Sequence, residues 1–193
     1  DTYNHLIRKI VISTGVVTTL AGTGSAGSAD NSTGTSASFN GPRGITTDGT
    51  NLYVADFSNH LIRKIVISTG VVTTVAGKLW GGAGDPGSAN GTGTSASFYN
   101  PRGITTDGTN LYVADKGNHL IRKIVISTGV VTTLAGTGSS GSANGTGTSA
   151  SFKGPCGITT DGTNLYVSDT YNHLIRKIVI STGVVTTLAG TGS

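Results

Sequence analysis

The chain has 193 residues, of which Gly, Ser and Thr supply 83, whereas Glu, Gln and Met are absent. Helices draw mainly on Ala, Leu, Glu, Lys, Gln and Arg, so this composition argues against a helical protein and favours strands of Val, Ile, Tyr and Thr. The formal net charge is +4, and no apolar run approaches the length of a membrane-spanning helix.

The distribution of charge and the single cysteine exclude further classes of protein and site. Eight of the 13 cations belong to four copies of one Arg-Lys pair, and this even spread is unlike the clustered charge of a nucleic-acid-binding protein. We therefore expect no nucleic-acid partner. The single Cys156 excludes an internal disulfide framework and a cysteine-based zinc site. Asp1 suggests the start of a mature or cut segment from which any targeting signal has gone.

One unit recurs along the whole chain. The segment Asn-His-Leu-Ile-Arg-Lys-Ile-Val-Ile-Ser-Thr-Gly-Val-Val-Thr-Thr begins at Asn4, Asn59, Asn118 and Asn172. A second segment, Gly-Ile-Thr-Thr-Asp-Gly-Thr-Asn-Leu-Tyr-Val, begins at Gly44, Gly103 and Gly157. Residues 169–193 are identical to residues 1–25. Repeats of this length indicate a solenoid, a propeller or a similar array.

The unit at residues 40–77 shows how each repeat is predicted to fold. Four strands are expected at 45–47, 52–55, 61–68 and 71–76, with turns between them. Asp-Gly in the first turn is a strong hairpin signal. The third strand is apolar on both faces apart from its Arg-Lys pair, which indicates burial between two layers.

The same pattern predicts further units at 99–136 and 153–190, and an outer hairpin at 1–25. Four antiparallel strands followed by a long return are typical of a propeller blade. Because one blade cannot bury both of its faces, blades stack around an axis. We therefore predict that residues 1–193 form one all-β propeller segment, with three complete four-stranded antiparallel blades and one outer hairpin.

These residues resemble the NHL repeat, named after the Asn-His-Leu triplet that stands here at residues 4–6 and in each later copy. The wider pattern also agrees: Phe39, Pro42, Gly44 and Ile45, then residues 52–56, then residues 62–65. The resemblance to bacterial NHL arrays implies a β-propeller, commonly of six blades. Relatives act as protein-binding or RNA-binding platforms, as ligand sensors on bacterial surfaces and, in one branch, as a metal-dependent amidating lyase. The fold does not choose among these roles.

The number of blades predicts association with other chains. Three blades and one outer hairpin are too few for an ordinary ring, so either the array continues or a second chain closes it. Two chains would supply six full blades and leave two outer hairpins over. Exposed strand edges and apolar faces recruit other chains. We therefore predict a homo-oligomer, either a two-chain ring or a filament.

Repeated polar residues are predicted to hold the blades together. The aspartate three residues before each triplet suits an Asx-type turn, and the arginine of the third strand needs a charge partner if it is buried. We expect these two to pair and the histidine to pack in its turn, because one histidine per blade is too widely spaced for a shared metal ion. We predict neither a metal site nor a cofactor. The structural positions are Asp56, Asn59, His60, Arg63, Asp115, Asn118, His119, Arg122, Asp169, Asn172, His173 and Arg176.

Three residues are candidates for ligand binding. Arg43 and Arg102 precede the innermost strands, so they are predicted to ring a channel mouth and attract an anion. The alternative is a solvated loop arginine, and Cys156 takes the same place in the third unit as a drifted arginine position. Trp80 lies in an insertion, where it either contacts a sugar or a partner or folds over its own blade.

Three Asn-x-Ser/Thr patterns, at 31–33, 90–92 and 144–146, match the glycosylation acceptor. We interpret them as turn chemistry instead.

The sequence thus predicts a non-catalytic scaffold or binding module that completes its ring or assembles with other chains, for example as a surface fibre. The alternative is an extracellular sensor that binds an anionic or glycan ligand at the channel mouth. No Glu is present for a carboxylate dyad, and the metal-binding residues of the amidating lyases cannot be matched here. We predict no catalytic residues and expect a bacterial, extracellular or cell-surface protein.

Overall fold

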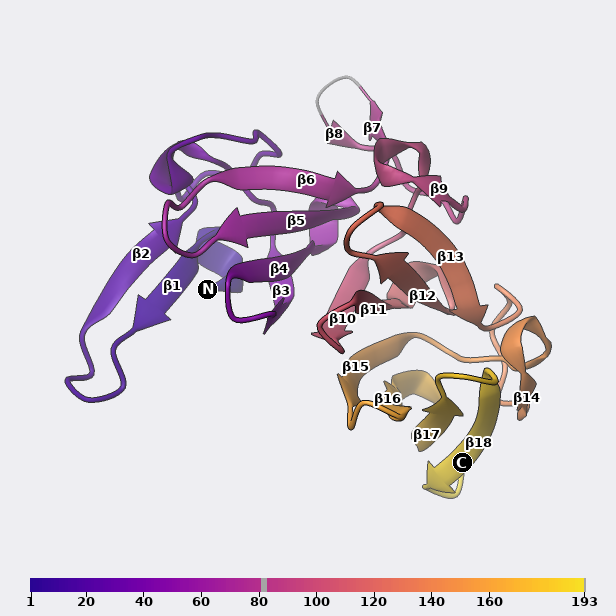
Figure 1. Ribbon diagram of the computed structural model, residues 1–193. Coiled ribbons are helices and arrows are strands. Elements are labelled where there is room, and N and C mark those ends of the chain that lie inside the picture. Colours follow the sequence, from indigo (N-terminus) through magenta and orange to yellow (C-terminus); the bar gives the residue numbers. More distant parts are fainter. Residues whose placement is uncertain (81–82, 193) are drawn as a thin grey trace.

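Each of the three repeat units folds into four antiparallel strands, and the resulting sheets fan around a shared centre as blades 1, 2 and 3 (Figure 1). The computed structural model describes residues 1–80 and 83–192. Each blade runs in chain order from its innermost to its outermost strand. The strands are β3 (Pro42–Thr47), β4 (Asn51–Asp56), β5 (Leu61–Val66) and β6 (Val72–Ala76) in blade 1; β10 (Pro101–Thr106), β11 (Asn110–Asp115), β12 (Leu120–Val125) and β13 (Val130–Ala135) in blade 2; and β15 (Pro155–Thr160), β16 (Asn164–Asp169), β17 (Leu174–Val179) and β18 (Val184–Ala189) in blade 3.

Shorter elements complete the chain. The hairpin of β1 (Ile7–Ile10) and β2 (Val17–Ala21) precedes blade 1, and the small hairpin of β7 (Leu79–Trp80) and β8 (Ala83–Gly84) follows it. Three-residue 3-10 turns are η1 (Thr2–Asn4), η2 (Gly34–Ser36), η3 (Phe57–Asn59), η4 (Gly93–Ser95), η5 (Lys116–Asn118), η6 (Gly147–Ser149) and η7 (Thr170–Asn172). No helix in the described ranges has the length and apolar character needed to cross a membrane.

The predicted all-β propeller architecture is confirmed, with two local differences in the strands. The first strand begins at Pro42 rather than Ile45, because a β-bulge between them carries the pairing with β4 further along. The third strand ends at Val66 and not at Ser68, because the Gly70 amide donates to the Val66 carbonyl (2.8 Å) and closes the turn early.

Close packing at the centre explains the glycine that follows the proline by two residues in blades 1 and 2. The innermost strands β3, β10 and β15 lie against one another. A Cβ atom at Gly44 would overlap the carbonyl oxygen of Arg102, and one at Gly103 would overlap that of Cys156. Only a residue without a side chain permits this approach. The same packing draws Arg43 and Arg102 to the centre.

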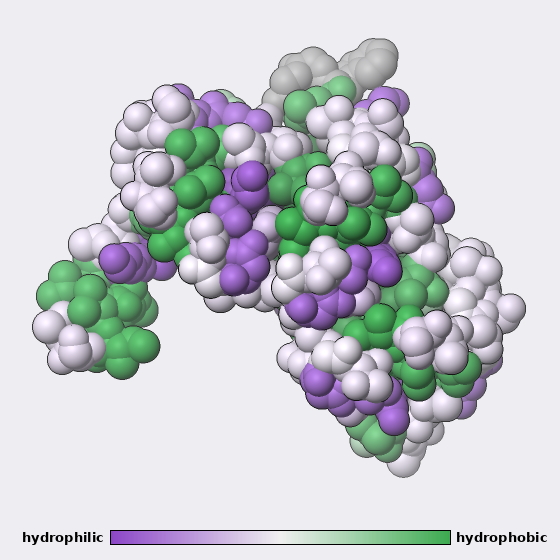
Figure 2. All heavy atoms as spheres, viewed as in Figure 1, coloured by the Kyte–Doolittle hydropathy of each residue, from purple (hydrophilic) through white to green (hydrophobic). Residues whose placement is uncertain are grey.

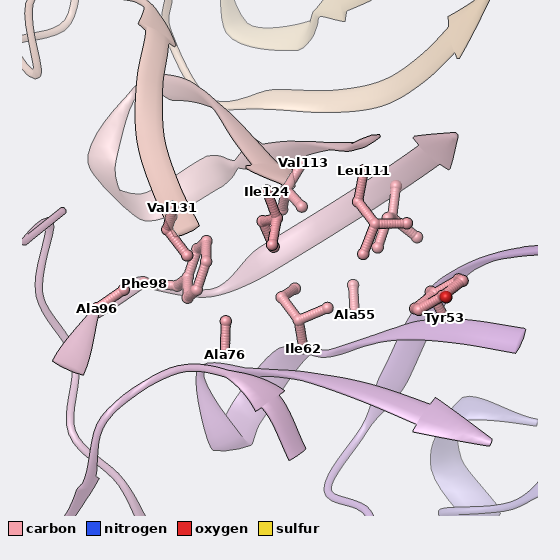
Figure 3. Close-up of a cluster of buried hydrophobic side chains, with 11 residues drawn as sticks. Tyr53, Ala55, Ile62, Ala76, Ala96, Phe98, Leu111, Val113, Ile124 and Val131 are labelled. Atoms are coloured by element: carbon pink, nitrogen blue, oxygen red, sulfur yellow. The ribbon is translucent and has the colours of Figure 1, made fainter. Parts of the chain in front are cut away.

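Successive blades bury their faces against each other. The cluster between blades 1 and 2 (Figure 3) consists of Tyr53, Ala55, Ile62, Ala76, Ala96, Phe98, Ile104, Leu111, Val113, Ile124 and Val131. Similar clusters lie between blades 2 and 3 and between the β1–β2 hairpin and blade 1. Full burial of one such aliphatic or phenylalanine side chain contributes about 1.5–3 kcal/mol, so these faces supply the main attraction between blades.

The linkers between blades are more ordered than the sequence predicted. In each linker a short segment pairs with the outermost strand of the blade that follows: β9 (Gly91–Thr92) with β13, β14 (Gly145–Thr146) with β18, and Asn31 with Val72 as a single bridge. The linker then delivers a fully buried phenylalanine, which is Phe39, Phe98 or Phe152. Each linker is therefore part of the core between two blades.

The Asp-Gly turns join the first and second strands of each blade. In blade 2, Asp107 Oδ1 accepts hydrogen bonds from the amides of Thr109 (2.8 Å) and Asn110 (2.6 Å), and Oδ2 accepts one from the Tyr112 hydroxyl (2.7 Å). Partial burial favours the neutral acid, but the hydrogen bonds from Asn110, Tyr112 and Thr109 outweigh it and lower the pKa of Asp107 to about 2. The pKa values of Asp48 and Asp161 are lowered by the same contacts.

We expect these turns to make stability fall in acid. A carboxyl whose pKa is lower in the folded chain than in the unfolded chain stabilises the fold above its unfolded pKa. That stabilisation is lost as pH falls from about 4 toward about 2. The variant with Asp48→Asn, Asp107→Asn and Asp161→Asn should be less stable at neutral pH but lose less stability across this acid range. Urea unfolding at a series of pH values measures both effects. If the variant loses as much stability in acid as the parent chain does, the acid sensitivity comes from other carboxylates.

Candidate functional site

Each complete blade contains a fully buried arginine on its third strand, and Arg122 in β12 illustrates its contacts. Nη1 donates to Asp115 Oδ2 (3.0 Å) and to the carbonyl of Ser97 (3.0 Å). Nη2 donates to the carbonyl of Ala89 (2.9 Å) and to Asn90 Oδ1 (2.9 Å). Since only the aspartate belongs to the blade and the other acceptors belong to the linker, the guanidinium fastens the linker to the blade. We call this set of contacts the arginine clamp.

The clamp recurs in the other two blades, so the predicted pairing of aspartate with arginine is present in all three. Arg63 donates to Asp56 (2.9 Å), Asp30 (2.7 Å) and the carbonyls of Ser38 and Ala29, and Arg176 donates to Asp169 (3.0 Å), Asn144 (2.8 Å) and the carbonyls of Ser151 and Ala143. Asp30 stands where the other linkers have asparagine. Arg63 is therefore held by two carboxylates.

Further donors hold the clamp aspartate in place. Asp115 Oδ1 accepts from the Tyr99 amide (2.8 Å), and Oδ2 accepts from Asn118 Nδ2 (2.8 Å). Removal from water raises the pKa of Asp115 to about 6, and the hydrogen bonds from Asn118 and Tyr99 and the charge of Arg122 oppose that rise. Asn118 Nδ2 also donates to the Gly87 carbonyl (2.7 Å), so the triplet asparagine is a second tie to the linker.

The linker phenylalanine completes each clamp. The guanidinium carbon of Arg63 lies 5.1 Å from the ring centre of Phe39. The corresponding distance is 5.1 Å from Arg122 to Phe98 and 5.2 Å from Arg176 to Phe152. These distances suit a cation–π contact, which strengthens away from water. Nε of each clamp arginine has no hydrogen-bond partner among the described residues, so the clamp acts through the two Nη atoms.

The β1–β2 hairpin carries the same residues without a linker to bind. Arg8 reaches Asp1 at 3.5 Å, and both side chains are about one third exposed. An ion pair in that setting contributes little to stability. The hairpin therefore provides an internal comparison for the clamp.

The triplet histidines connect neighbouring blades. Nδ1 accepts an amide hydrogen from the next blade in three copies, His5 from Gly41, His60 from Asn100 and His119 from Gly154, each at 3.0 Å. All four histidines adopt a left-handed turn, with φ between 54° and 58°. Burial lowers the pKa of His60 below its usual value, which keeps Nδ1 free to accept. Among the described residues, no three His, Cys or Asp side chains gather as a metal site would require.

The sequence predicted turn chemistry for all three Asn-x-Ser/Thr patterns, but not all three of these asparagines form turn contacts. Asn31 does, since its Oδ1 accepts from the Thr33 amide (2.9 Å). Asn90 and Asn144 instead accept from the clamp arginines. The difference arises because Asp30 takes the clamp position in the first linker and leaves Asn31 to the turn.

A cavity of about 390 Å³ opens at the centre of the fan, and we call it the axial cavity. It is lined by Thr2, Arg43, Gly44, Arg102, Gly103, Cys156 and Gly157. The structure thus brings together the two arginines and the cysteine that the sequence placed at a channel mouth. Arg102 Nη1 donates to Cys156 Sγ (2.8 Å), so the third repeat position contacts the second directly. Among the residues that the structure describes, no acidic side chain lines this cavity.

Arg43, which lines the axial cavity, belongs to a series of cationic and aromatic side chains from all three blades. The Arg43 guanidinium lies 4.4 Å from the ring centre of Phe57. Lys116 Nζ lies 5.9 Å from the same ring and 5.4 Å from that of Tyr171. The sequence analysis missed Phe57, Lys116 and Tyr171, which occupy the turns after the second strands and meet only when the blades are stacked.

A comparison of the three copies could have found these residues. Residues 39–77, 98–136 and 152–190 differ from one another at only seven of 39 aligned positions. Five of the seven are the positions of residues 40, 41, 43, 57 and 58. They lie close to the end of the blade at which Pro42 of the first strand pairs with Asp56 of the second. Most differences between the aligned copies therefore lie near the strand ends that bring Arg43, Arg102 and Cys156 to the axial cavity.

The role of Trp80, either in contact with a sugar or a partner or folded over its own blade, stays a prediction. Its backbone belongs to β7, but its side chain lies outside the described residues. The neighbouring Lys78 pairs with Asp85 (2.8 Å) across the base of this insertion.

Comparisons with known proteins agree with the repeat pattern. The NHL repeat model matches residues 39–65 and 98–124. Similar proteins include the chloroplastic protein SUPPRESSOR OF QUENCHING 1 of Arabidopsis thaliana, which is 32% identical over 93% of this chain and 18% of its own length. Human NHL repeat-containing protein 2 is 28% identical over the whole of this chain and 31% of its own length. The chain thus spans less than one third of these curated relatives.

Solved structures share the fold at low identity. An auxiliary nutrient binding protein from Bacteroides thetaiotaomicron matches with a TM-score of 0.70 and 21% identity, over 97% of this chain and 44% of its own. Virginiamycin B lyase from Staphylococcus aureus matches with a TM-score of 0.56 and 17% identity, over 97% of this chain and 49% of its own. At these identities the likeness describes the propeller fold.

The clamp predicts different losses for two arginines in the same repeat position. Arg122→Ala should lower the free energy of unfolding by about 3–5 kcal/mol, because it leaves Asp115 buried without its charge partner. Arg8→Ala should cost less than about 1 kcal/mol, because that pair is solvated. Urea unfolding of both variants beside the parent chain measures the difference. Equal losses would show that the clamp contributes nothing beyond a surface ion pair.

Proposed function

We propose that this chain, which is built of NHL repeats, is a non-catalytic β-propeller binding module and that its axial cavity binds an anion. The observation that carries the proposal is which of its arginines are paired with a carboxylate. Arg63, Arg122 and Arg176 are each matched by a buried carboxylate. In the part of the chain that the structure describes, the two cavity arginines form no ion pair with a carboxylate, so an anion there would meet unmatched positive charge.

The geometry of the two cavity arginines suits an oxyanion. A guanidinium offers a planar fork of N–H donors that can bind carboxylate, sulfate or phosphate through two parallel hydrogen bonds. The cation–π contact with Phe57 holds the Arg43 guanidinium over that ring, and the contact with Cys156 holds one end of Arg102. Both groups are thus oriented before a ligand arrives, which reduces the entropy lost on binding.

The non-catalytic part of the proposal rests on how the repeat uses its titratable side chains. Asp115 is engaged in a clamp, Asp107 in a turn and His119 in a bond between blades. These side chains lie one per blade rather than together in a cleft. The lyase and the nutrient binding protein share only their fold with this chain, so the proposal depends on the axial cavity itself.

Titration calorimetry with sodium sulfate tests the proposal. We expect weak binding that declines as NaCl is raised, because salt screens exposed charges. The double variant Arg43→Ala with Arg102→Ala should bind at least about tenfold more weakly, a change of about 1.4 kcal/mol. Lys64→Ala with Lys123→Ala is the matched control, since it removes the same charge from strands outside the cavity.

Two outcomes would refute the anion site. One is sulfate binding that survives loss of both cavity arginines, and the other is equal weakening in the lysine control. A sulfated and a neutral oligosaccharide of the same length, compared in the same titration, then show whether the cavity selects charge or sugar.

A further inference from the structure

Lys116 is a cation that only one blade carries. Most charged side chains recur once per blade, as the lysine after each clamp arginine does, and Figure 2 shows hydrophilic groups on each of the three blades. At the position of Lys116, blades 1 and 3 have Phe57 and Thr170 instead. Lys116 begins η5 directly after β11, at the end of blade 2 that also carries Arg102. Blade 2 therefore places two cations at this end.

Two aromatic rings from the neighbouring blades lie beside the Lys116 ammonium. Nζ lies 5.9 Å from the ring centre of Phe57 in blade 1 and 5.4 Å from that of Tyr171 in blade 3. Both distances suit a cation–π contact, in which the face of the ring attracts the cation. Such contacts hold the ammonium in place while its three N–H donors stay available to an acceptor. The half-buried Lys116 side chain is thus positioned where a ligand can reach it.

Packing between blades 2 and 3 sets the position of the Tyr171 ring. The ring lies over Gly154, where a Cβ atom would overlap it. The Gly154 amide donates to Nδ1 of His119 (3.0 Å), the residue that follows η5. These contacts connect the ring to the turn that carries Lys116. The ring beside the ammonium is therefore fixed by the same histidine that connects the two blades.

The Phe57 ring connects Lys116 to the axial cavity. Its centre lies 4.4 Å from the guanidinium carbon of Arg43, which lines the cavity. The two ring distances place the charges of Arg43 and Lys116 within about 10 Å of each other, close to the screening length in physiological salt. Among the described residues, neither cation forms an ion pair with a carboxylate. A ligand with negative charge at both cations would relieve their mutual repulsion.

We propose that Lys116 is a second anion-binding residue, and that the ligand of the axial cavity carries at least two oxyanion groups in close succession. This inference rests on the proposed function of the cavity. Arg43 and Arg102 bind one group, and the Lys116 ammonium binds the next. The ligand class is a chain of linked phosphates or a sulfated sugar, because both carry charged groups at short intervals. A ligand with one charged group can occupy the cavity but leaves Lys116 unmatched.

Titration calorimetry with inorganic tripolyphosphate and orthophosphate, in buffer free of divalent cations, tests the second contact. The parent chain should bind tripolyphosphate at least about tenfold more tightly than orthophosphate, because the longer anion gains a hydrogen bond between charged groups. Lys116→Gln should weaken tripolyphosphate binding at least about tenfold and orthophosphate binding by less than about threefold. Lys116→Arg should retain the preference, because arginine keeps a positive charge beside both rings.

The matched control is Lys123→Gln, which removes one lysine from β12 of the same blade, away from the cavity lining. It should change the affinity for either anion by less than about threefold. Circular dichroism and urea unfolding of each variant show whether the fold is retained. A trisulfated and a monosulfated disaccharide of the same sugars, titrated in the same way, distinguish a sulfated sugar from linked phosphates as the ligand.

Three results would overturn the second contact. They are equal affinity of the parent chain for the two phosphates, tripolyphosphate binding that Lys116→Gln leaves unchanged, and equal weakening in the Lys123→Gln control. The proposed function fails on a different result, which is sulfate binding that survives the loss of Arg43 and Arg102. If those two arginines are required and Lys116 is not, the cavity binds an anion but this inference is wrong.

Discussion

A positive charge buried inside every blade must be matched, and this requirement fixes the path of the chain between blades. A buried guanidinium without partners would cost several kcal/mol, so it needs a carboxylate and further acceptors. The blade supplies one aspartate, and the linker supplies two carbonyls and one side-chain oxygen. A linker rich in Gly, Ser and Ala, with little apolar surface of its own, is thereby ordered. The linker in turn carries the phenylalanine that fills the space between blades.

This division of labour explains where the copies differ. The clamp arginine and its blade aspartate, the triplet and the linker phenylalanine are the same in all three blades. Most of the differences between copies lie beside the ends of the first two strands, next to the clamp aspartate and the glycine contact at the centre. There the copies present Arg43, Arg102 or Cys156 to the axial cavity and different residues around it. A uniform scaffold with one variable face is a suitable basis for ligand binding.

Much of the fold follows from the sequence, because its signals are local. Asp-Gly turns, alternating apolar residues and the repeat itself predict the four strands and their order. The pair of Asp56 and Arg63 was predictable because a lone cation in an apolar strand needs a partner. The linker contacts were not predictable, since their acceptors are mainly backbone carbonyls, which no residue type marks. The aromatic contacts of Lys116 were missed because Phe57 and Tyr171 come from two other blades.

Amide hydrogen exchange in the variant Arg122→Lys tests the clamp most directly. Lysine keeps the charge beside Asp115 but cannot reach two carbonyls and an amide at once, so the variant separates the charge from the fork. The account predicts that amides of residues 87–97 exchange at least about tenfold faster, while those of residues 27–38, held by Arg63, keep their protection. Unchanged protection in both linkers would contradict it, because charge alone would then suffice to order the chain between blades.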